Sequence, residues 1–418
     1  METLVIGGGL IGLTSAYVLQ TMGESVTLLE AKKGIGLDTS FANGGLLTAS
    51  MSDPWNAPGA CKQLVTSLVD PNSAMKLRMA ALPSLFFWGL HFLRHSSVRR
   101  HSIATAANYA LSTYSIKKTK ALREQLDLTY QSCSTGTLKL FRNKAAMVSS
   151  LAIAKRLQGV GLLFKQLSAN EVIELEPALE PIEKEIAGAL YFPNDESGDA
   201  YLFCQALAQA FKQAGGTIQT QTTAHRIAIE KQKVIGVETG QGFLPAKRVV
   251  LAAGNQSPSL LKGTGLSLRI KPVKGYSLTV DLNGSAVRPI IPVIDDALHA
   301  AATPLGTRLR LAGTAEFAGF DARLDSRRID NLLNFLKALY PNIYENMNRE
   351  TASPWTGFRP MSADGLPFIG PSNIKGLYIN TGHGHLGWTM AMGSAHLLAS
   401  FIREQTPDID PSPFNPLR

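Results

Sequence analysis

Three glycines close to the amino terminus have the spacing of a dinucleotide-binding turn. The apolar run Thr3 to Ile6 precedes them, and a helical pattern follows. The first glycine permits a tight turn, the second lets the backbone approach a pyrophosphate, and the third lets helix and strand pack closely. The N–H groups at the start of such a helix bind phosphate. The predicted cofactor contacts of this turn are Gly7, Gly9, Leu10, Ile11 and Gly12.

A carboxylate stands where the ribose of the dinucleotide is expected. The apolar run Ser25 to Leu29 is typical of a second strand and ends at Glu30, 18 residues after Gly12. A carboxylate there accepts hydrogen bonds from ribose hydroxyls, and its charge repels the 2′-phosphate of NADP. The motif therefore predicts FAD or NAD without separating them. Ala31 and Lys32, which follow directly, are predicted to contact the same cofactor.

Three later segments combine small residues with glycine. The first is a loop with small hydroxyls; alone, it equally suits an ordinary polar turn. The second ends the apolar strand 248–251. The third reads as strand, glycine loop and helix, whose start would stabilise the negative charge of a reduced flavin and so favours FAD. Their predicted cofactor contacts, with Ala224 added, are Thr39, Ser40, Asn43, Gly44, Gly45, Ala253, Gly254, Gly384, Leu386, Gly387, Trp388 and Thr389.

From end to end the chain resembles the FAD-dependent D-amino acid dehydrogenases of the small-subunit type. Their wider family includes glycine oxidase, sarcosine oxidase and D-amino acid oxidase. The resemblance rests on eight motifs: VIGGGLIG at 5–12, DTSFANGG at 38–45, PWNAPG at 54–59, GTLKLFR at 136–142, PNDESGD at 193–199, KGYSLT at 274–279, WTGFRPMSADGLP at 355–367 and NTGHGHLGWTMA at 380–391.

The resemblance implies an α/β (α+β) fold, in which a mixed-sheet substrate domain is inserted into a Rossmann-like FAD-binding domain. A chain of 418 residues is also long enough for two domains with a ligand between them. We expect the FAD-binding domain at 1–50, 145–260 and 330–418, and the substrate domain at 51–144 and 261–329.

The implied reaction is oxidation of D-amino acids to imino acids, which hydrolyse to 2-oxo acids and ammonium. Electrons would pass to a quinone or another membrane acceptor. An oxidase or dehydrogenase of glycine, sarcosine, proline or hydroxyproline would share every cofactor motif. A third possibility is an FAD-binding subunit of an amine-oxidising complex that does not turn over substrate alone.

Four residues are candidates for the substrate chemistry. Hydride transfer from an amino acid needs its carboxylate anchored and its α-carbon held over the flavin. Arg359 presents a fork suited to that carboxylate, although most arginines form ordinary salt bridges. The resemblance suggests Tyr276 as a second carboxylate donor and His385 as a neighbour of flavin or substrate. Lys274 is a candidate for promoting reaction with dioxygen.

Residues 75–100 are rich in Leu and Phe, with Pro83 inside and basic residues at both ends. The pattern is typical of an interfacial element, and equally of helices inside the substrate domain. Without a signal-peptide pattern at the start, we expect a cytoplasmic protein, peripheral on the inner face of the cell membrane.

Composition adds several expected absences. Lys and Arg exceed Asp and Glu by nine, but no nucleic-acid motif accompanies this charge. Cys61, Cys133 and Cys204 are far apart, and the histidines lack metal-ligand spacing, so we expect neither a disulfide framework nor a metal. Residues 407–416 are rich in proline and are predicted to form a solvated tail.

Overall fold

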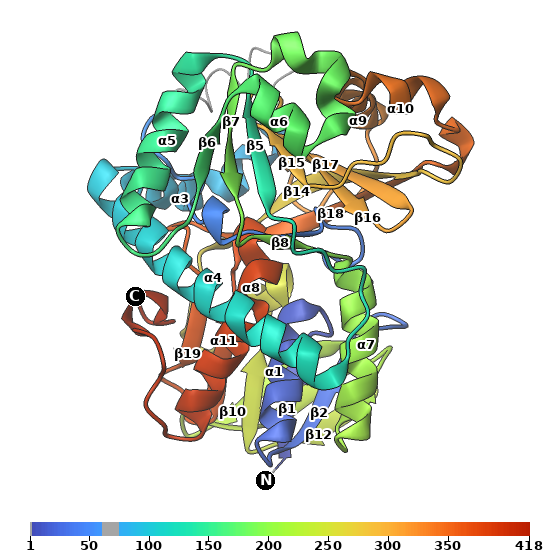
Figure 1. The fold of residues 1–418 in the computed structure, drawn as a ribbon. Coiled ribbons are helices and arrows are strands. Elements are labelled where there is room, and N and C mark those ends of the chain that lie inside the picture. Colours follow the sequence, from blue (N-terminus) through green and yellow to red (C-terminus); the bar gives the residue numbers. More distant parts are fainter. Residues whose placement is uncertain (1, 61–74) are drawn as a thin grey trace.

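The computed structural model describes residues 2–60 and 75–418, so Cys61 lies outside the described residues. Two large sheets form the two halves of the molecule in Figure 1, with the chain's amino terminus in the lower half. The chain passes between these halves several times. Segments that are far apart in the sequence therefore meet between them.

The lower half contains a six-stranded sheet in which all neighbours are parallel except the edge pair β19 and β20. Its strands are apolar runs because both faces of the sheet are covered. In spatial order they are β19 (Phe368–Pro371), β20 (Leu377–Thr381), β13 (Arg248–Leu251), β1 (Glu2–Ile6), β2 (Ser25–Leu29) and β9 (Thr217–Gln219).

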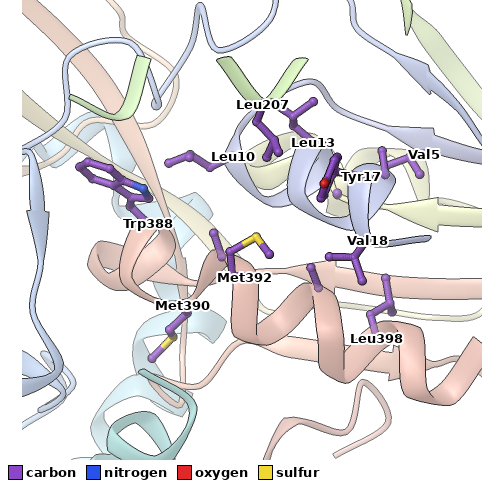
Figure 2. Packing of buried hydrophobic residues seen from close by; sticks show 14 of the residues in the cluster. Val5, Leu10, Leu13, Tyr17, Val18, Leu207, Trp388, Met390, Met392 and Leu398 are labelled. Atoms are coloured by element: carbon purple, nitrogen blue, oxygen red, sulfur yellow. The ribbon is translucent and has the colours of Figure 1, made fainter. Parts of the chain in front are cut away.

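Helices α1 (Leu10–Thr21), α7 (Ala200–Gln213) and α11 (Gly387–Ile402) share a hydrophobic cluster on one face of this sheet. Figure 2 shows Leu10, Leu13 and Val18 of α1 packed beside Met392 and Leu398 of α11. The opposite face carries a separate cluster with a small antiparallel sheet and the short helix α8 (Ser257–Leu260). The strands of that small sheet are β10 (Ala224–Glu230), β11 (Lys233–Thr239) and β12 (Gly242–Pro245).

The upper half contains a mixed nine-stranded sheet, which matches the mixed sheet expected for a substrate domain. Helices α6 (Ala169–Leu175), α9 (Ser326–Leu339) and α10 (Pro341–Asn346) cover one part of it, and α5 (Lys144–Gln158) covers another. The strands are β18 (Ser353–Ser362), β14 (Ile270–Asp281), β17 (Arg308–Phe317), β16 (Ala300–Leu305), β15 (Val293–Asp295), β5 (Thr137–Phe141), β7 (Gly188–Phe192) and β6 (Lys165–Leu167), with β4 (Met75–Leu77) beside β17.

Three strands lie in a different sheet from the one that our expected domain ranges imply. We expected β6 and β7, within 145–260, and β18, within 330–418, in the FAD-binding domain. In the nine-stranded sheet, β18 instead pairs with β14, β7 pairs with β5, and β6 pairs with β7. Sequence motifs mark cofactor loops, whereas strand pairing depends on distant partners. The domain boundaries stay a prediction, and we propose to move these strands to the substrate side.

Two long-range features join the halves. Helix α4 (Val98–Leu126) runs diagonally across both and packs on α11, where Ser115 Oγ accepts from Gly393 N at 2.9 Å. The strands β3 (Leu46–Leu47) and β8 (Glu196–Ser197) form a small ladder between the halves. Helix α3 (Leu82–Arg94) precedes α4.

The carboxyl-terminal segment is not the solvated tail that its proline content predicted. Phe414 is only 1% exposed, and Arg418 pairs with Asp364 at 2.7 Å. A single large apolar side chain thus anchors a segment whose average composition is polar.

Candidate functional site

The start of α1 is built to receive a phosphate. A Cβ on Gly7 would lie 2.6 Å from Ala252 O, and one on Gly12 would lie 1.8 Å from Gly7 O, so both glycines are required by packing. Gly9 has more room, with only Ser40 Oγ nearby at 3.4 Å. No side chain caps the helix at Gly9, although Ser40 Oγ accepts from Leu10 N at 3.1 Å. An uncapped helix start next to small residues fits an anionic group.

Glu30 lies at the end of β2, as predicted. Its two carboxylate oxygens accept from Gly8 N and Lys32 N, each at 2.7 Å. Burial raises the pKa of Glu30, and the two backbone donors partly oppose this shift. The backbone of 30–32 also bonds to residues 221 and 222, which brings the start of β10, and hence Ala224, to this region. The arrangement can fix a ribose beside the phosphate turn.

The loop from Thr39 to Gly45 is held between the two sheets. Ser40 contacts the start of α1 below it. From above, three side chains of the nine-stranded sheet donate to its carbonyl groups: Ser277 to Ala42 (2.7 Å), Thr303 to Gly44 (2.7 Å) and Arg310 to Asn43 (3.1 Å). Asn43 also closes the turn internally, because its Oδ1 accepts from Gly45 N at 3.1 Å. A loop fixed on both sides is suited to positioning a flavin ring edge.

The carboxyl-terminal glycine loop meets the end of β13. Thr381 Oγ1 donates to Gly254 O at 3.3 Å, directly after Ala253. Helix α11 begins at Gly387, as predicted, without a side-chain cap or an acidic residue in its first turn. Thr389 Oγ1 accepts from Thr48 N at 3.1 Å, which attaches the chain after the Thr39–Gly45 loop to α11. A second free helix start therefore lies among the predicted cofactor segments.

The ring of Trp388 belongs to the core more than to the site. It packs 6.2 Å from the ring of Tyr130 and 6.4 Å from that of Phe203, measured between centroids. Figure 2 shows it beside Leu10 at the start of α1. Its Nε1 is buried and has no hydrogen-bond partner in the part of the chain that the structure describes.

Arg359 lies on β18, with its guanidinium over Gly275 of the neighbouring strand β14. Its Nη1 donates to Thr314 O at 3.1 Å, and Cζ lies 5.3 Å from the centroid of the Trp55 ring. Among the described residues, no carboxylate lies within ion-pair distance of it. Burial lowers the pKa of Arg359 to about 10, so the guanidinium stays charged at neutral pH. This half-buried fork is free to bind a carboxylate from outside the chain.

A distortion of β17 orients the Thr314 carbonyl group, which accepts the hydrogen bond from Arg359. The register between β14 and β17 shifts between Lys274 and Tyr276, and Thr314 has φ +62°. A β-branched residue rarely adopts this conformation, which persists where surrounding structure holds it. The bulge turns the Thr314 carbonyl toward the guanidinium instead of into the ladder.

The cofactor segments are also tied to the backbone beside Arg359. The carbonyl of Phe358 accepts from Thr39 Oγ1 at 2.8 Å and from Asn255 Nδ2 at 3.0 Å. Thr39 belongs to the predicted flavin loop, and Asn255 follows Gly254. These two bonds fix the distance between β18 and the cofactor segments.

His385 joins Arg359 through Trp55. The imidazole stacks on the indole at 5.4 Å between centroids, with 19° between the planes. Burial lowers the pKa of His385, so the ring is neutral at physiological pH. Its Nε2 lies 3.3 Å from Met51 O, which favours the tautomer protonated there. An aromatic and a neutral imidazole thus wall the space beside the guanidinium.

Lys274 and Tyr276 do not meet Arg359. They alternate with Gly275 along β14 and therefore face the opposite side of the sheet. Tyr276 Oη donates to Glu316 Oε2 at 2.7 Å, and Lys274 Nζ lies 3.8 Å from the same carboxylate. Burial lowers the pKa of Lys274, and burial and Glu316 together raise that of Tyr276. The fold brings Arg359 and His385 together and separates both from this buried cluster.

Sequence reasoning missed the residues that support Arg359. Gly275 stands in the KGYS motif. Only the pairing of β14 with β18 shows that its missing side chain makes room for the Arg359 guanidinium. Trp55 lies in the quoted motif PWNAPG, and Asn255 directly follows the strand end at Gly254. Nothing in the sequence signals the φ of Thr314.

Comparisons with known proteins show which family the chain belongs to. The family model described as "FAD dependent oxidoreductase" (DAO) matches residues 2–401. A D-amino acid dehydrogenase of Vibrio vulnificus is 36% identical over 402 residues, covering 96% of each chain. D-amino acid dehydrogenase 1 of Mesorhizobium japonicum is 36% identical and covers 98% of this chain and 97% of its own.

Solved structures show the same fold. An L-proline dehydrogenase from P. horikoshii superposes with a TM-score of 0.79 at 20% identity, covering 100% of this chain and 97% of that one. A glycine oxidase from Geobacillus kaustophilus gives 0.75 at 24% identity, covering 99% and 97%. Two uncapped helix starts, the glycine cradle and the carboxylate of Glu30 fit FAD. The chain therefore belongs to the family of FAD-dependent oxidoreductases, together with its D-amino acid dehydrogenase relatives.

Proposed function

We propose that this enzyme oxidises the α-carbon–nitrogen bond of D-amino acids and releases 2-oxo acids and ammonium after the imino acid hydrolyses. One observation carries the proposal: Arg359 is a charged, half-buried fork without a carboxylate partner among the described residues, next to the cofactor segments. The names of the relatives that are 36% identical over nearly the whole chain support the D-configuration.

The chain's own residues would orient the substrate. Arg359 binds the substrate carboxylate through two parallel N–H groups, while the Thr314 carbonyl fixes the guanidinium plane. The Trp55 ring and neutral His385 form an uncharged wall beside the guanidinium. FAD, when bound, accepts the hydride from the α-carbon. The bonds from Thr39 and Asn255 to Phe358 hold the anchor at a constant distance from the cofactor segments.

A panel of D- and L-amino acids, glycine, sarcosine, L-proline and hydroxyproline tests this proposal on the purified, FAD-loaded chain. We expect reduction of an artificial dye, together with equal amounts of 2-oxo acid and ammonium, with D-amino acids only. Turnover of glycine or L-proline alone would instead favour the activities named for the two structural neighbours. Flavin that no amino acid reduces would favour a non-autonomous subunit of a larger complex.

We further propose that the enzyme works at the inner surface of the cell membrane and passes electrons to a quinone. Helix α3 supports a surface contact, because it buries Leu85, Trp88 and Phe92 and exposes an opposite apolar face. On that face Phe86 is 60% exposed and Phe87 is 77% exposed.

Basic residues precede and follow the exposed rings of α3 in the sequence. They are Lys76, Arg78, Arg94, Arg99 and Arg100, of which Arg78 forms ion pairs with Glu316 and Asp325. An apolar helix face flanked in sequence by cations suits an anionic lipid surface, where the rings enter the headgroup layer. In the described part of the chain, no helix is long and apolar enough to cross a membrane.

A further inference from the structure

A cavity of about 500 Å³ lies outside the site around Arg359. One side of it is a single face of α4, with residues at positions 109, 113, 116, 117, 120, 121 and 124. The other side consists of residues 161–163 after α5, of Phe192 at the end of β7, and of residues 194 and 195 after it. This volume falls in the range of small-molecule sites.

The cavity has a buried apolar floor and an exposed polar rim. Its floor contains Tyr109, Ile116, Leu162 and Phe192, which belong to one hydrophobic cluster. The rim is exposed and carries Thr113, Lys117, Glu124 and Asn194. Lys120, also at the rim, pairs with Glu196 at 3.2 Å. Such a site suits a ligand with a flat apolar body and few polar atoms, and suits a multiply charged anion poorly.

A buried carboxyl group also lines the cavity. The carboxyl group of Asp195 is 2% exposed and accepts from Ser50 N at 3.2 Å and from Ser50 Oγ. These two bonds fix its position. Protonated, the group can donate to a ligand carbonyl; ionised, it can accept from a ligand hydroxyl.

The floor connects directly to the cofactor segments. Ala49, which lines the cavity, follows Thr48, and the N–H of Thr48 donates to Thr389 Oγ1 in the first turn of α11. The next residue, Ser50, is the one that bonds to Asp195. Thr48 therefore links the wall of the cavity to Thr389, which is predicted to contact the cofactor.

We propose that this cavity binds the ring of the quinone that reoxidises the enzyme. The proposal rests on the proposed function and deepens it by naming the acceptor's site. In the step, fully reduced FAD gives up two electrons and two protons and returns to its oxidised form. The quinone takes up the two electrons and the two protons and becomes the quinol. The amino acid oxidised beforehand supplied both electrons.

Equilibrium dialysis of the oxidised, FAD-loaded enzyme with a short-chain benzoquinone tests binding without turnover. Ile116→Trp fills the floor, and Ala121→Trp blocks the exposed rim without disturbing the core. Val148→Trp on α5, a site that is exposed and outside the cavity, is the matched control. We expect affinity to fall at least about tenfold in both cavity variants and to stay unchanged in the control. Equal affinity in all four proteins, or no saturable binding to the parent, would overturn the proposal.

A second measurement separates this inference from the proposed function. Each cavity variant should still lose its flavin absorbance when mixed with D-alanine without oxygen, and should still reduce a small soluble dye. Turnover with the short-chain benzoquinone should fall at least about tenfold. Undiminished quinone turnover contradicts the acceptor site. If neither D-alanine nor any other D-amino acid reduces the flavin of the parent enzyme, the proposed function fails, and dialysis still decides whether the cavity binds the quinone.

Discussion

A Cβ atom on Gly275 would lie 2.5 Å from Nη1 of Arg359, so the absent side chain of the glycine is the space that the guanidinium occupies. The two residues lie on adjacent strands, two pairs apart in the register of β14 and β18. The position of the anchor thus depends on the side chain that Gly275 lacks.

Gly275→Ala should weaken substrate binding while leaving the fold intact. The new methyl meets the far end of a flexible side chain, which swings away at small cost to stability but leaves the carboxylate-binding position. We expect kcat/KM for D-alanine to fall about 10- to 100-fold, as for loss of a charged hydrogen bond. Gly89→Ala on α3, where a Cβ meets nothing within 4 Å, serves as control. Steady-state kinetics of both variants at equal FAD content decide the matter.

Arg359→Lys keeps the charge and removes the fork. A single ammonium cannot reproduce two parallel N–H groups, so KM for D-alanine should rise and kcat/KM should fall at least about tenfold. Retained FAD, measured from visible absorbance, shows that the loss concerns substrate alone. The exposed Arg226→Lys controls for the substitution itself. If both variants keep the parental KM, Arg359 does not bind the carboxylate.

How far the sequence could predict this site differs between its parts. The phosphate turn, Glu30 and the start of α11 at Gly387 are local features, because each motif contains the strand, turn and helix that shape it. The pairing of β14 with β18 is set by residues about 80 positions apart, and no local pattern encodes it. Tyr276 and Lys274 illustrate the consequence. Their motif suggests a place beside Arg359, but their side chains face the opposite side of the sheet.

Glu30→Ala should release the cofactor. The carboxylate lies at the predicted ribose position and also orders the turn through Gly8 N and Lys32 N. We expect at least about tenfold weaker FAD binding from the loss of charge-assisted hydrogen bonds. Titration of the apoprotein with FAD, followed by flavin fluorescence, measures this. The exposed Glu230→Ala is the control, and equal affinity in both variants would exclude Glu30 from the cofactor site.

Asp195 should make stability depend on pH. Burial raises its pKa to about 7, against 3.8 for the free side chain, while bonds from Ser50 oppose the shift. The folded protein therefore binds this proton more tightly than the unfolded chain. Its contribution to stability is full below about pH 4 and is lost as pH rises to about 7. Asp195→Asn should remove this contribution to the slope. The change in Tm between pH 5 and pH 8 should therefore differ between variant and parent, and identical slopes would contradict a raised pKa.

Phe87→Asp should release the enzyme from vesicles that contain anionic lipid. The substitution places a charge at the most exposed ring of α3, so partition into the headgroup layer weakens. Dye-linked oxidation of D-alanine should stay at the parental level, because Phe87 lies outside the site. Phe243→Asp, at another exposed ring, is the control. Sedimentation with vesicles gives the bound fraction, and equal binding of all three proteins would remove the membrane proposal.

The most direct test of the central claim is anaerobic mixing of the FAD-loaded enzyme with D-alanine in a stopped-flow spectrometer. We expect rapid loss of the flavin's visible absorbance with D-alanine, slower loss when the α-hydrogen is deuterium, and none with L-alanine. We also expect that Arg359→Lys needs a higher D-alanine concentration for the same rate. Flavin that stays oxidised with D-alanine and with every other D-amino acid would contradict the account.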